Sequence, residues 1–201
     1  NMPSKHKPRS GSLQFWPRVR SKTSKPRIRT WTKDNDAKPL AFIGYKAGMA
    51  HVILKDNKPT SMTKGETISV PVTIVECPAI KIASSRFYKN TITGKKIISE
   101  ILSEKIDKSL KRKINIPKKQ KATIPSPEDY DEVRILVYTQ PNKLSNSKKK
   151  PELMEISLGG KKEDQLTFIK ENEGKDIIIN DVFEENELTD IHAVTKGKGF
   201  Q

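Results

Sequence analysis

The chain has 201 residues, with 39 Lys and Arg against 24 Asp and Glu, and a formal net charge of +15. Its apolar content is 33%, and no apolar run approaches the roughly 18 residues that a membrane-spanning helix needs, so we expect no membrane partner. The single Cys77 excludes an intrachain disulfide and fits a reducing, cytoplasmic setting.

Residues 1–39 are predicted to form an extended basic arm. The first 33 residues carry ten Lys or Arg and no acidic residue. Such a segment has too little apolar surface to offset its chain entropy, and its like charges repel. A polyanion is therefore expected to order it, and the phosphate backbone of a nucleic acid is the commonest candidate.

Aromatic rings lie among these charges and offer faces on which bases can stack. We expect the arginines to fork onto phosphates or stack on bases, and the lysines to act as point charges. Trp16 is the best stacking candidate, although Trp16 and Trp31 could instead anchor the arm on its own domain. The arm residues expected to bind RNA are Lys5, His6, Lys7, Arg9, Ser10, Trp16, Arg18, Arg20, Lys22, Lys25, Arg27, Arg29 and Trp31.

Three strands are predicted after the arm. LAFIGY (40–45) is typical of a buried strand, a turn at 46–48 leads into a second strand at 49–55, and a β-branched run at 68–77 forms a third. Pro71 within the third strand indicates an edge, a strand start or a bulge. This pattern favours an antiparallel sheet or barrel.

The middle of the chain is predicted to be helical over 95–114, because its apolar residues recur at spacings of three and four. The end of this helix and a lysine-rich loop, 105–121 and 143–150, form a second basic set and suggest a second contact surface. For any single lysine here, a solvated face is the simpler interpretation.

The last third alternates again between strand and helix signals. Strands are predicted at 133–139 and 152–158, and a short helix over about 161–173 is closed by Gly174. Near the end of the sequence, Lys196 and Lys198 flank small residues that let a backbone approach phosphates closely.

Motifs of catalysis are lacking in the sequence. It holds no phosphate-binding Gly-x4-Gly-Lys-Ser/Thr loop and no Gly-x-Ser-x-Gly elbow, and its three histidines are far apart. With one cysteine they make no zinc pattern. We therefore expect no enzyme, no cofactor and no metal.

Four stretches carry a resemblance to a known family. PSKHKPRSGSLQFWPRVR (3–20), KPLAFIGYKAGMAHV (38–52), VPVTIVEC (70–77) and VTKGKGFQ (194–201) resemble the universal large-subunit ribosomal protein three (L-three) family. The arm and the middle of the chain resemble its archaeal and eukaryotic branch. The resemblance runs along nearly the whole chain, and it adds Lys46, within GYKAGM, to the residues expected to bind RNA.

The resemblance implies a mainly β fold with an α/β insertion: a translation-protein-type antiparallel β-barrel, incomplete here, with an inserted α/β subdomain. It implies the basic arm at 1–39, the first barrel strands at 40–82, the insertion at 83–175, and a return to the barrel and the start of a central loop at 176–201. The family continues past KGKGFQ, so we expect a missing C-terminal segment of the same protein to complete the barrel.

The function that the resemblance implies is structural. The chain is expected to bind large-subunit ribosomal RNA, to contact neighbouring ribosomal proteins, and to support early subunit assembly and the architecture around the peptidyl-transferase centre in translation. Two alternatives stay open: a general nucleic-acid or chromatin module with a nonspecific polycationic arm, and an enzyme built on the same barrel.

Overall fold

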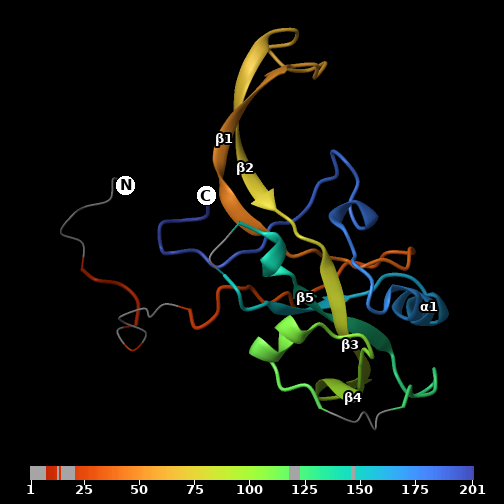
Figure 1. Ribbon diagram of the computed structural model, residues 1–201. Helices are drawn as coiled ribbons and strands as arrows, with labels where there is room; N and C mark the ends of the chain where they lie inside the picture. The colour runs from red at the N-terminus through yellow and green to blue at the C-terminus, as the bar shows by residue number, and fades with distance from the viewer. Residues whose placement is uncertain (1–7, 13, 15–20, 118–122, 146–147) are drawn as a thin grey trace. The chain divides into compact units, whose positions relative to one another are not determined.

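The computed structural model describes residues 8–12, 14, 21–117, 123–145 and 148–201. The chain divides into two compact units, one made of the described parts of residues 1–30 together with Leu188–Gln201, and the other of Trp31–Glu187. The first unit has no α-helix or β-strand among its described residues. The second holds the strands and the α-helix (Figure 1).

A two-stranded antiparallel hairpin opens the second unit. β1 (Tyr45–Lys55) pairs with β2 (Thr67–Glu76), and the two form a long curved ribbon (Figure 1). The strand predicted at 68–77 is confirmed. The strand at 40–45 and the turn at 46–48 are wrong. Residues 41–44 are irregular, and β1 starts at Tyr45 and continues through 46–48, where a β-bulge between Lys46 and Gly48 takes up the extra residue.

The other four strands form one antiparallel sheet in the order β4-β3-β5-β6. The strands predicted at 133–139 and 152–158 are confirmed as β5 (Glu132–Thr139) and β6 (Leu153–Ser157). The central strand β3 (Ile80–Thr91) was not predicted, because the polar residues in its middle interrupt the apolar pattern.

The helix predicted over 95–114 is wrong. Gly94–Leu102 is strand β4, which pairs with β3, and only a short 3-10 helix, η2 (Lys108–Arg112), follows it. The isoleucines of this stretch suit either element, since their spacings of three and four fit a helix while their branched side chains favour a strand. Hydrogen bonding to β3, closed by a turn with Gly94 at φ +120°, selects the strand.

The sheet buries apolar side chains on both faces. On β5, Ile135 and Val137 belong to one hydrophobic cluster, while the alternating residue Tyr138 belongs to another, as the two-residue period of a strand requires. The first cluster packs against the predicted helix, now α1 (Lys162–Asn172), and includes residues beside the 3-10 helix η4 (Ile179–Asp181). The second is covered by η2, and a further short turn, η3 (Pro141–Lys143), follows β5.

The expected mainly β architecture is therefore present, and the described residues form two open antiparallel sheets and one short α-helix. Among the described residues no strand closes either sheet into a barrel.

Ion pairs hold the polar part of one sheet face together, and Glu155 lies at their centre. Its two carboxylate oxygens accept hydrogen bonds from Arg86 Nη1 at 2.8 Å and from Arg134 Nη1 at 2.9 Å, and the Tyr88 hydroxyl donates to it at 2.9 Å. Arg134 also pairs with Glu132 at 2.6 Å. Burial opposes ionisation of Glu155, but the hydrogen bonds from the arginines outweigh it and lower its pKa.

This cluster predicts a dependence of stability on pH. Because the pKa of Glu155 is lower in the folded than in the unfolded chain, its carboxylate stabilises the fold above the ordinary pKa of 4.5, and this contribution is lost as the pH falls through that value towards the folded pKa. Urea unfolding of Glu155→Gln should show a loss of about 2 kcal/mol at pH 7 and a smaller loss near pH 3. Glu163→Gln, at an exposed position of α1, should change neither value, and an equal loss at both pH values for Glu155→Gln would contradict the role of its charge.

Candidate nucleic-acid interface

The described part of the arm in the first unit is irregular and presents its charges outward. Lys22, Arg27 and Arg29 are exposed, and Lys25 is half-buried. Local hydrogen bonds shape the backbone: Ser21 Oγ donates to the Thr23 carbonyl at 2.8 Å. Such bonds replace helix and sheet pairing, so the described part of the segment forms neither a helix nor a strand.

The remaining arm residues fall into two groups. Arg9 and Ser10 are described and exposed. Lys5, His6, Lys7, Trp16, Arg18 and Arg20 lie outside the described residues, so their expected contacts with RNA stay predictions.

The segment Leu188–Gln201 of the same unit carries the glycine and lysine repeat. Lys196 and Lys198 are exposed, and Gly197 and Gly199 have φ angles of +83° and +86°. A Cβ at either glycine would meet nothing within 4 Å, so the backbone conformation, not crowding, favours glycine there. The exposed amides between the two lysines make this segment a suitable contact for phosphate groups.

Trp31 takes a different place from the rest of the arm. Its ring packs against the hydrophobic cluster that includes Ile80 and Ile156, and its Nε1 is buried with no hydrogen-bond partner among the described residues. The packing gives Trp31 the anchoring role that the sequence left open for it. Any stacking of this ring on a base would compete with that packing.

The base of the arm is bound to the edge of β6. Leu40 N–H donates to the Ser157 carbonyl at 3.0 Å, and the amides of Gly159 and Gly160 donate to the carbonyls of Lys38 and Asp34 at 3.0 and 2.9 Å. A Cβ on Gly159 would lie 2.4 Å from the Asp36 carbonyl oxygen. The two glycines therefore let the base of the arm lie close to the chain after β6, which fixes the point from which the arm starts. The sequence analysis did not predict this role, because a glycine pair before a helix is also typical of a simple turn.

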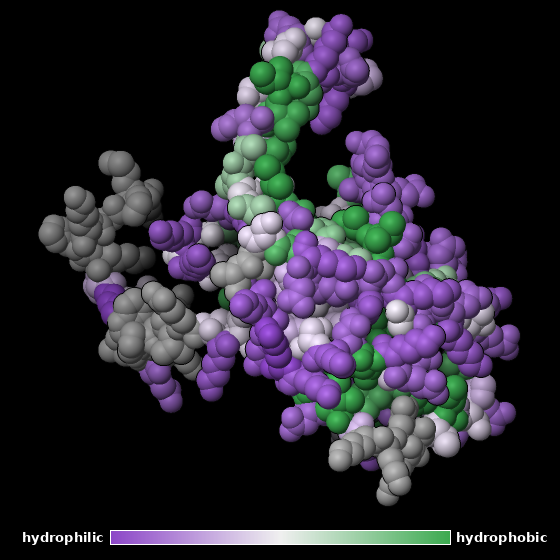
Figure 2. Space-filling model, in the orientation of Figure 1, coloured by the Kyte–Doolittle hydropathy of each residue, from purple (hydrophilic) through white to green (hydrophobic). Residues whose placement is uncertain are grey.

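Lys46 is exposed on β1, beside the bulge. The hairpin that carries it is only loosely covered: Met49, Ile53 and Ile74 are 55%, 74% and 50% exposed. Figure 2 shows this apolar colour running along the hairpin. At its base the Tyr45 hydroxyl lies 2.7 Å from Thr139 Oγ1, which ties the ribbon to β5.

Three lysines of the second basic set, which spans 105–121 and 143–150, form ion pairs with acidic residues of the fold. Lys143 pairs with Asp176 at 2.6 Å, Lys148 pairs with Glu152, and Lys113 reaches the same carboxylate at 2.9 Å. Burial opposes ionisation of Glu152, but the hydrogen bonds from Lys148 and Lys113 lower its pKa. These three lysines therefore serve the fold, whereas Lys149 and Lys150 and the lysines of η2 remain exposed among the described residues.

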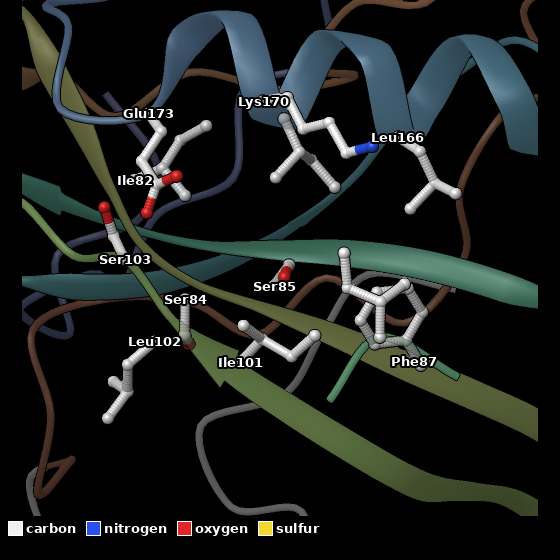
Figure 3. A pocket seen from close by; sticks show the side chains of 12 residues that line it. Ile82, Ser84, Ser85, Phe87, Ile101, Leu102, Ser103, Leu166, Lys170 and Glu173 are labelled. Carbon is white, nitrogen blue, oxygen red and sulfur yellow. The ribbon is translucent and has the colours of Figure 1, made fainter. Parts of the chain in front are cut away.

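A cavity of about 80 Å³ lies between α1 and the sheet. Figure 3 shows Phe87 and Ile101 below it, Leu166 above it, and the hydroxyls of Ser85 and Ser103 at its wall. Ser103 Oγ is buried and has no hydrogen-bond partner among the described residues. The helix packs mainly against β5, so this apolar space is a packing gap over the β3–β4 side of the sheet.

Metal sites and membrane-spanning helices are both absent from the part of the chain that the structure describes. No group of three or more His, Cys, Asp or Glu side chains there could hold a metal ion. None of its helices is both long enough and apolar enough to cross a membrane.

Comparison with known proteins gives a consistent result along the whole chain. The family model described as "Ribosomal protein L3" matches residues 2–132 and 126–201. The large ribosomal subunit protein uL3 of Archaeoglobus fulgidus is 43% identical, and that of Methanocaldococcus jannaschii is 42% identical, each over 203 residues. The matches cover 98% of this chain and 61% of each relative, so the chain spans about three fifths of the length of the curated relatives it matches.

The docking of the arm on the chain after β6 predicts that adding one methyl group at Gly159 lowers the stability of the fold. Gly159→Ala should destabilise the chain by about 1–3 kcal/mol, since its new Cβ meets backbone and not a flexible side chain. Hydrogen exchange should show lost protection at the Leu40 and Gly160 amides. Gly48→Ala is the matched control, because a Cβ there meets nothing within 4 Å, and equal effects of the two substitutions would refute this account of the docking.

Proposed function

The chain belongs to the ribosomal protein L3 family, and on that premise we propose that it is a structural constituent of the large ribosomal subunit that binds large-subunit ribosomal RNA. The family match along nearly the whole chain is the observation that carries the proposal. Its role is that of a scaffold and not of a catalyst. It acts on the ribosome in the cytoplasm.

The RNA contacts come mainly from basic residues that the fold leaves exposed. The arm carries ten Lys or Arg in its first 33 residues without an acid, and most of its described bases are exposed. Lys46, Lys196 and Lys198 add exposed charges outside the arm. Most contacts are to phosphates and to RNA shape, because the deep groove of an RNA helix hides its base edges.

The arm is anchored to the edge of β6 at its base, and this anchoring suits a role in assembly of the ribosomal subunit. A charged segment that starts from a fixed strand edge can enter folded RNA while the compact unit Trp31–Glu187 stays outside. Ordering the arm at binding supports early assembly of the subunit and the architecture around the peptidyl-transferase centre. Neighbouring ribosomal proteins are further partners.

The proposed domain plan follows the family. The arm occupies 1–39, the first barrel strands 40–82, the α/β insertion 83–175, and the return to the barrel 176–201. The exposed apolar side chains of the β1–β2 hairpin support a translation-protein-type barrel, because an isolated two-stranded ribbon is marginal in water. A further C-terminal segment of the same protein would cover the hairpin and complete the barrel.

Salt dependence tests the phosphate contacts. If the chain neutralises about six phosphates, log K for large-subunit RNA should fall by roughly 4–5 per log unit of salt. Arg27→Gln with Arg29→Gln should lower this slope by about 1.5. Filter binding at four salt concentrations measures both values.

The matched control removes the same charge elsewhere. Lys89→Gln with Lys96→Gln, at exposed positions of the β3–β4 hairpin, should leave the slope near that of the unchanged chain. A nearly flat salt dependence would be incompatible with the proposed contacts. Equal competition by duplex DNA would favour a general polycationic module.

Deletion of the arm separates binding from folding. A chain lacking residues 2–30 keeps Trp31 and should fold with little loss of stability, while losing most of its affinity for large-subunit RNA. Extending the deletion to residue 33 removes the Trp31 ring and should cost about 3 kcal/mol more. Circular dichroism melts and RNA binding of both chains measure the two effects, and unfolding of the shorter deletion would show that the arm serves the fold.

A further inference from the structure

A second concave surface lies beside η2, and neither the fold nor the arm accounts for it. The groove has a volume of about 450 Å³ and a floor of Leu102, Ile106 and Ile116. Lys108 and Lys111 line it as well. Its volume falls within the range of about 300–1,000 Å³ that small-ligand sites occupy.

The two lysines are held on a fixed support. Leu110, between them in the chain, is fully buried in the cluster that includes Tyr138 and Leu153. Asp107, just before η2, accepts a hydrogen bond from the Tyr138 hydroxyl at 3.0 Å and pairs with Lys81 at 3.1 Å. The short helix is therefore fixed at its start and its middle, and its exposed lysines keep their place beside the apolar floor.

The charges of this groove are available to a ligand. Lys108 and Lys111 are exposed and form no ion pair with any residue that the structure describes. This sets them apart from Lys113, which is bound to Glu152 at 2.9 Å. Two solvated cations next to three aliphatic side chains suit a ligand that joins an anionic group to a flat, weakly polar one.

We propose that this groove binds one nucleotide of single-stranded RNA, with its base on the floor and its flanking phosphates on Lys108 and Lys111. This rests on the proposed function only in taking RNA as the partner. Unpaired RNA bases can turn outward and bury a face against protein, while backbone phosphates pair with lysine. Glu104 also lines the groove, and its carboxylate can accept a hydrogen bond from a base amino group.

An acidic peptide is the competing ligand, and the groove fits it less well. Carboxylates would satisfy the two lysines but leave the three aliphatic side chains uncovered. A nucleotide places its charge and its apolar face on the two kinds of surface that the groove offers.

The experiment needs a local readout, because the arm is also proposed to bind RNA. The full chain, labelled at isoleucine methyl groups, is titrated with a single-stranded adenosine pentanucleotide. We expect saturable NMR shifts at Ile106 and Ile116 and none at Ile53 on the β1–β2 hairpin. Lys108→Gln with Lys111→Gln should weaken this local binding by roughly tenfold or more at 0.1 M salt, since two phosphate contacts are lost.

Lys149→Gln with Lys150→Gln is the matched control, because it removes the same charge at exposed positions that do not line the groove. It should leave the shifts at Ile106 and Ile116 unchanged. The inference is overturned if RNA shifts neither methyl group, if both double variants lose the same affinity, or if a glutamate pentapeptide shifts the methyl groups and RNA does not. Retained binding of large-subunit RNA in each of these cases would leave the proposed function standing.

Discussion

The pairing of β3 with both of its neighbours is the interaction on which the rest of the structure depends. Ile80–Thr91 hydrogen-bonds to β4 on one side and to β5 on the other. The same strand bridges Ile177 through Ile80, which brings the region of η4 onto the core. Once β3 is central, β4 must be a strand, and the chain after it must cross the sheet face through η2. The position of the groove beside η2 follows from that crossing.

The charged residues of the compact unit are divided between ion pairs that serve the fold and side chains exposed to solvent. Several acids of the compact unit pair with bases of the same unit, as Glu155 does with Arg86 and Arg134, and Asp176 with Lys143. Those bases hold strands and loops together and are not available to a polyanion. Other bases, such as Lys108 and Lys111, are exposed and form no ion pair with any residue that the structure describes.

Patterns within one element were enough to predict part of the fold. The β-branched run at 68–77 and the apolar runs at 133–139 and 152–158 became strands, and 161–173 became α1. The helix prediction for 95–114 was wrong because Ile97, Ile98 and Ile101 suit a helix or a strand. Pairing with β3, which was not predicted, selects the strand. The role of Trp31 could not be predicted for the same reason. Its ring packs on a core formed by residues distant in the sequence, and a local pattern does not show such packing.

The sequence by itself determined the family and the uneven distribution of charge, because net charge, acid-free segments and long matching stretches are properties of the order of residues. Tertiary structure alone decided which bases remain available. Lys113 and Lys143 look like Lys108 and Lys111 in the sequence, yet the first two face carboxylates and the last two face solvent beside an apolar floor. The physical reason is that neutralising a charge requires a partner within about 4 Å, and chain folding, not spacing, brings that partner there.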